Sequence, residues 1–116
     1  MGGLDATNAF YDLIAQELEP RLAAEPPRPL NHWMLISDAE GTTICRLDDE
    51  TEGMEVDSIL ASHIERGASA AAFITARDGF VLAQVLLGDP RNSDVRRASL
   101  KEESGELRLG SWTPAL

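Results

Sequence analysis

The sequence contains a single cysteine, Cys45, so no disulfide can form within the chain. No CxxC pair and no histidine cluster accompanies it, so the common zinc motifs are excluded and we expect no metal or other cofactor. Cys45 lies in a run rich in β-branched residues. There we expect a buried, unreactive thiol.

Long apolar runs are also missing, because 18 successive apolar residues occur nowhere in the chain. The first 30 residues contain acids and prolines instead of the apolar core of a signal peptide. We therefore expect a soluble, cytoplasmic protein that does not bind membranes. Nine of the ten basic residues are arginine and alanine is abundant, which is typical of a GC-rich bacterial or phage genome.

Basic residues are scarce relative to acids, ten against twenty, and the formal net charge is −10. Residues 1–57 carry thirteen acids and three bases, whereas residues 58–116 carry seven of each, so the whole net charge comes from the first half. A nucleic-acid-binding protein needs clustered bases to neutralise phosphates, so this function is disfavoured. An acidic half favours a basic protein partner, or simply keeps the protein soluble.

Two segments have the apolar period of an amphipathic helix. In residues 5–24 the apolar side chains recur at steps of three or four, although Pro20 removes one backbone donor. We expect a kink near Gln16 or a restart of the helix at Pro20. The same period returns in residues 54–66, where Gly67 is placed to end the helix.

The remaining apolar runs predict three hairpins. Their strands are expected at residues 33–37 with 42–47, 70–76 with 80–87, and 95–101 with 107–112. Asp78-Gly79 is a strong hairpin signal, and the run 80–87 is apolar on both faces, which predicts a central strand covered on both sides. Helical crossovers are mostly absent, so the pairing should be antiparallel.

We therefore predict one compact α+β domain over residues 1–116. It should contain an antiparallel sheet of about five or six strands and two helices, in the order α-ββ-α-ββ-ββ. In this order of elements the chain is similar to the roadblock and profilin-like dimerisation domains and to small acidic secretion chaperones. That resemblance implies a role in dimerisation or partner binding, and it assigns no individual residue.

An acidic segment contains Asp48, Asp49, Glu50 and Glu52. Its spacing matches the first half of an EF-hand, but the twelfth position is Ile59, where a bidentate glutamate is required. The segment is therefore interpreted as a solvated loop before a helix, without a metal site. No nucleophile motif is present, and His63 and Cys45 have no sequence signature that pairs them. We assign no catalytic residue.

Arginines near the end of the chain are the strongest candidates for an interaction surface. Arg91, Arg96, Arg97 and, across a hairpin, Arg108 are expected to form a basic strip on an acidic protein. Such a strip suits carboxylates or phosphates, or pairs with the acidic half of the same chain or of a second copy. Trp112 either anchors the tail to the core or is exposed as a binding hot spot.

The leading hypothesis is a non-enzymatic protein-interaction or dimerisation module, acidic and homodimeric, which binds a protein partner or itself. One alternative is a small-molecule-binding or hydrolytic domain that uses the 88–94 loop with His63 or Cys45. Another is an acidic inhibitor or immunity-type protein that presents residues 48–57 to a basic site.

Overall fold

The computed structural model describes residues 2–24, 30–47, 56–77, 79–88 and 93–115. Its elements follow the predicted order, with a short seventh strand at the end. They are α1 (Gly2–Ala24), β1 (Leu30–Asp38), β2 (Gly41–Leu47), α2 (Val56–Glu65), β3 (Ala70–Arg77), β4 (Phe80–Leu87), β5 (Ser93–Glu103), β6 (Glu106–Leu109) and β7 (Thr113–Pro114). The three predicted hairpins are confirmed.

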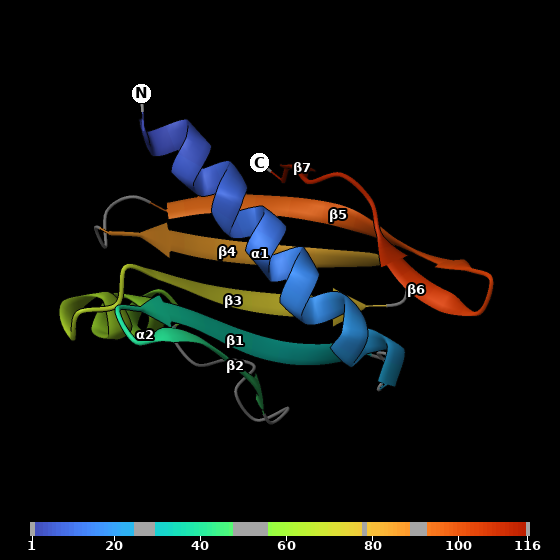
Figure 1. Ribbon diagram of the computed structural model, residues 1–116, viewed down its shortest axis with the longest axis horizontal. Helices are drawn as coiled ribbons and strands as arrows, with labels where there is room; N and C mark the ends of the chain where they lie inside the picture. Colours follow the sequence, from blue (N-terminus) through green and yellow to red (C-terminus); the bar gives the residue numbers. More distant parts are fainter. Residues whose placement is uncertain (1, 25–29, 48–55, 78, 89–92, 116) are drawn as a thin grey trace.

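All strands belong to one antiparallel sheet with the order β2-β1-β3-β4-β5-β6, and β7 pairs with β5. The predicted α+β class is therefore confirmed. Strand β1 also pairs with β3, although β2 and α2 lie between them in the sequence. Figure 1 shows α1 running diagonally across one face of this sheet, with β2 at one outer edge and β5, β6 and β7 at the other.

The first helix lies on the sheet through a stripe of fully buried side chains spaced three or four residues apart. The stripe contains Tyr11, Ile14, Leu18 and Leu22. The helix continues through Pro20 to Ala24, so it does not restart at Pro20. Pro20 is exposed.

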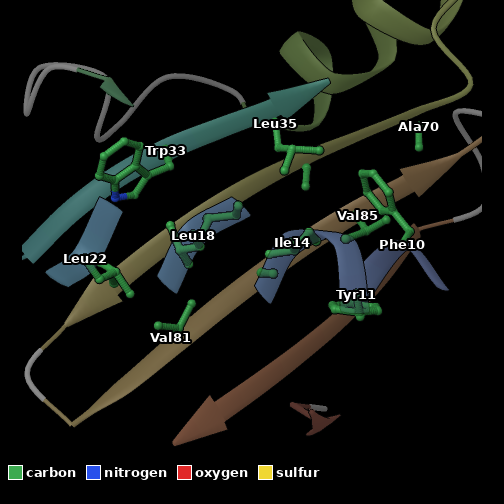
Figure 2. Close-up of a cluster of buried hydrophobic side chains, with 14 of the residues drawn as sticks. Phe10, Tyr11, Ile14, Leu18, Leu22, Trp33, Leu35, Ala70, Val81 and Val85 are labelled. Atoms are coloured by element: carbon green, nitrogen blue, oxygen red, sulfur yellow. The ribbon is translucent and has the colours of Figure 1, made fainter. Parts of the chain in front are cut away.

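Small side chains on the sheet allow this helix to approach closely. Beneath the helix lie Ala70, Ala72, Ala76 and Ala83, together with larger side chains such as Trp33 and Val81. Figure 2 shows Leu18, Ile14 and Tyr11 pointing at this surface. Removing so much apolar surface from water is the main stabilising contribution, at roughly 25 cal/mol per Å².

The second helix covers only one end of the opposite face. Leu60 and Ile64 of α2 pack on Met34, Ala71 and Leu86. A ten-residue helix is about 15 Å long, whereas an eight-residue strand extends about 26 Å, so α2 cannot cover the length of β4. The prediction that β4 is covered on both faces is therefore wrong in part, and Leu82 is 36% exposed.

Candidate functional site

The predicted arginine strip is divided between the two faces of the sheet. Arg96 and Arg97 are neighbours on β5, and side chains alternate along a strand. The Arg96 guanidinium lies 4.5 Å from the centre of the Tyr11 ring, on the α1 face. The Arg97 guanidinium lies 5.1 Å from the centre of the Phe80 ring, on the face of α2.

Arg108 shares the α2 face with Arg97. It is opposite Lys101 in the β5–β6 ladder and is paired with Glu106 at 3.0 Å, an exposed ion pair. Arg91, the fourth predicted member, lies outside the described residues. The described arginines thus form no single strip, and within the described residues Arg96 pairs with Asp94 and Arg108 with Glu106, both in the second half of the chain.

Arg96 joins α1 to β5. Its Nη1 donates to Asn8 Oδ1 at 2.8 Å. Its Nε lies 2.9 Å from Asp94 Oδ2, which makes an ion pair by distance although the angle is not that of a hydrogen bond. With Tyr11 beneath the guanidinium, these contacts hold Arg96 in one place, and its side chain is 16% exposed.

Tyr11 is almost fully buried, and its hydroxyl donates to the backbone carbonyl of Asp94 at 3.3 Å. Burial raises the pKa of this hydroxyl far above its usual range, the Asp94 contact raises it further, and the charge of Arg96 opposes the rise. Tyr11 therefore remains a neutral hydrogen-bond donor at physiological pH. Sequence reasoning did not identify this role.

Trp112 packs the tail onto the core, which is the first of the two alternatives predicted for this residue. Its ring centre is 5.0 Å from that of Tyr11, and the side chain packs half-buried against the core. Its Nε1 is buried and has no hydrogen-bond partner among the described residues. This arrangement leaves a hollow of about 490 Å³ lined by Asn8, Tyr11, Asp12 and Ala15 of α1, by Arg96, and by residues 109–112.

The tail also covers the outer edge of β5. Residues 100–103 pair with β6, and Arg96 and Arg97 pair with β7. Between these ladders, the backbone N–H of Gly110 donates to the Ser99 carbonyl at 2.8 Å, and beyond the β7 ladder that of Ala115 donates to the Val95 carbonyl at 3.1 Å. A β-carbon at Gly110 would lie 2.4 Å from Ser99 Oγ, so glycine permits this close approach.

The opposite edge differs. Within the described part of the chain, β2 has one neighbouring strand, β1, and its outer edge pairs with none. Most of its side chains are exposed, including Thr42, Thr43 and Cys45. The expectation of a buried thiol is therefore wrong, because Cys45 is on an edge strand at a position that α2 does not cover. Sequence reasoning did not identify this edge.

Among the described residues, His63 and Cys45 are not brought together. His63 is half-buried beside a hollow of about 340 Å³ that Asp38, Glu40 and Arg66 also line, and Cys45 is not among its described lining residues. The acidic residues Asp48, Asp49, Glu50 and Glu52, and residues 89–92 of the 88–94 loop, lie outside the described residues.

His32 is a buried histidine on β1. Its Nδ1 lies 3.1 Å from Thr75 Oγ1, and its ring stacks on Phe73. Among the residues with described positions, no three His, Cys, Asp or Glu side chains are grouped to hold a metal ion.

The chain matches no protein-family profile, no curated protein and no solved structure. No helix in the described ranges is long and apolar enough to cross a membrane.

Proposed function

We propose that the protein is a non-enzymatic dimerisation module whose two copies pair through the outer edges of β2. The observation that carries this proposal is the contrast between the two edges of the sheet. The chain covers β5 with its own tail, whereas no described residue pairs with the outer edge of β2. An uncovered edge presents unpaired N–H and C=O groups, which a second strand can satisfy.

The composition of β2 supports this pairing. The strand Gly41-Thr42-Thr43-Ile44-Cys45-Arg46-Leu47 contains no proline, no acid and one base. Proteins usually protect an edge strand with prolines, inward charges or bulges, and within β2 the one charged residue is Arg46. Because β2 itself contains no acid, no two carboxylates would face each other within a ladder of two β2 strands.

Symmetry restricts how two β2 strands can pair. A two-fold axis perpendicular to the sheet makes the strands antiparallel and keeps both α1 helices on the same side. Because facing residues in an antiparallel ladder point to the same face, each residue meets itself or a residue an even number of positions away. Cys45 of one copy therefore lies near Cys45 of the other, on the α2 face of a continuous sheet.

Seven residues of main-chain pairing bury less surface than the roughly 800 Å² per partner of a standard interface. We therefore expect a weak dimer, with a dissociation constant on the order of 10 µM. Added salt should strengthen it or leave it unchanged, since screening reduces the repulsion between two acidic copies. A dimer held by arginines against acids would weaken with salt.

Sedimentation of the purified protein from ~1 µM to ~500 µM, at ~0.05 M and ~0.5 M salt, tests the proposal. The expected result is a reversible dimer that persists at high salt. Cys45 is the only thiol, so a bismaleimide with a spacer of ~10 Å should cross-link two copies at a single position.

Two glutamate substitutions on the same face of the sheet test whether the dimer forms through the edge of β2 or through the open face of the sheet. Thr43→Glu on β2 brings like charges together in the dimer and should weaken it at least ~10-fold. Leu82→Glu on β4 introduces the same charge away from the edge and should leave the dimer intact. If Leu82→Glu abolishes the dimer and Thr43→Glu does not, the interface lies on the open face around Arg97 instead of at the β2 edge. A wild-type protein that is a folded monomer at every concentration would overturn dimerisation.

A further inference from the structure

We infer that the hollow between α1 and the tail binds a small organic monocarboxylate, with Arg96 as its anion-binding side chain. This site is formed by α1, β5 and residues 109–112, away from the β2 edge. It is therefore independent of the proposed dimerisation.

Arg96 is already held in position for such a ligand. Its contacts with Asp94 and Asn8 involve Nε and one N–H of Nη1, and the other three of the five guanidinium N–H groups have no acceptor among the described residues. The Tyr11 ring supports the guanidinium from below at 4.5 Å. A preorganised guanidinium loses little side-chain entropy when it donates two parallel hydrogen bonds to a carboxylate.

The rest of the hollow suits a carboxylate with an apolar body. Ala15, Leu109 and Trp112 provide apolar lining, and Ser111 offers a hydroxyl. Because Asn8 accepts from Arg96 through its Oδ1, its amide NH₂ is available as a donor. A volume of about 490 Å³ is within the range of small-molecule sites.

Charges around the hollow restrict the ligand to a single negative charge. Asp12 lines the hollow, and Asp94 is paired with Arg96, so a second negative charge on the ligand would be repelled. More distant acids matter less, because the screening length is about 8 Å at physiological ionic strength. Phosphate and dicarboxylates should therefore bind less well than a monocarboxylate of similar size.

Benzoate and benzamide are matched probes, because they have similar shapes and differ in charge. Each is titrated into ¹⁵N-labelled protein, with the indole N–H of Trp112 and the Nε–H of Arg96 as readouts. Benzoate should cause saturable shifts with a dissociation constant on the order of 1 mM or lower, and benzamide should bind at least ~10-fold more weakly. Equal binding of the two probes, or no saturable shift with benzoate, overturns the inference.

Adjacent arginines on opposite faces supply matched variants. Arg96→Gln should weaken benzoate binding at least ~10-fold, whereas Arg97→Gln should leave it unchanged. Because Arg96 also joins α1 to β5, Ala15→Leu is a second variant that fills the hollow and keeps the arginine. Benzoate binding should be lost in a folded Ala15→Leu protein, and unchanged binding in both Arg96→Gln and Ala15→Leu would exclude this site.

Discussion

On one side of the sheet the tail covers β5 with the short strands β6 and β7, while on the other side the seven-residue β2 is itself the edge strand and its outer side pairs with no described residue. The edge at β5 is joined by β6, by β7 and by two further backbone hydrogen bonds, and Trp112 fastens this tail to α1. The edge at β2 has exposed threonines and an exposed thiol. The difference teaches that the C-terminal residues protect β5, whereas the outer side of β2 has no neighbouring strand within the described part of the chain.

Removing the tail should have the largest effect. A chain that ends at Glu103 loses the half-buried Leu107, Leu109 and Trp112, each of which contributes about 1–2 kcal/mol. That sum approaches the whole stability of many domains, roughly 5–15 kcal/mol. We expect an unfolded or aggregated protein in thermal unfolding and gel filtration. A truncated chain that unfolds at the wild-type temperature would show that the tail does not protect β5.

Trp112→Ala should cost about 2–3 kcal/mol in urea denaturation, because a half-buried aromatic side chain is lost from the Tyr11 contact. Trp112→Phe keeps an aromatic ring, although a smaller one, and removes a buried N–H that has no described partner, so it should cost about 1 kcal/mol or less. Equal losses in the two variants would mean that the ring contact does not anchor the tail.

Tyr11 should make the stability decrease at high pH. Its pKa is raised in the folded state, so above about pH 10 the unfolded chain loses a proton that the folded chain keeps. The free energy of unfolding should then fall by about 1.4 kcal/mol per pH unit relative to Tyr11→Phe, and this contribution is fully present below pH 10. Tyr11 is the only tyrosine, so phenolate absorbance reports it directly. Phenolate formation near pH 10 before unfolding would contradict this prediction.

Hydrogen exchange should distinguish the two edges in the monomer. We expect outward-facing amides of β2 to exchange at least ~10-fold faster than amides of β5 that face β6 and the tail. Raising the protein concentration into the dimer range should slow exchange in β2 and leave β5 unchanged. Similar protection of both strands at the lowest concentration would mean that the β2 edge is covered.

The smallest effect is expected for Arg108→Gln on the covered edge. Arg108 and Glu106 form an ion pair with both side chains more than half exposed, and such pairs contribute less than about 0.5 kcal/mol. The urea midpoint should therefore change little. A decrease in the free energy of unfolding above about 1 kcal/mol would mean that this ion pair contributes substantially to holding β6 on β5.

The arginines of β5 and the single cysteine show where prediction from the sequence reached its limit. Alternation along β5 placed Arg96 and Arg97 on opposite faces, yet the sequence does not say which face α1 covers, and they were grouped in one strip. Cys45 was expected to be buried because its neighbours are apolar and β-branched. Its exposure depends on β2 being an edge strand, which is a property of the strand order.

By itself the sequence determined the two helices, the three hairpins and the antiparallel α+β class, because apolar period and turn residues act over a few neighbouring positions. The tertiary structure decided which edge is covered and which groups surround Arg96. Those features depend on contacts such as Tyr11 with Asp94 and Asn8 with Arg96, which join residues 83 and 88 positions apart. No local pattern encodes such contacts, since they exist only after α1 and the tail have packed on the same sheet.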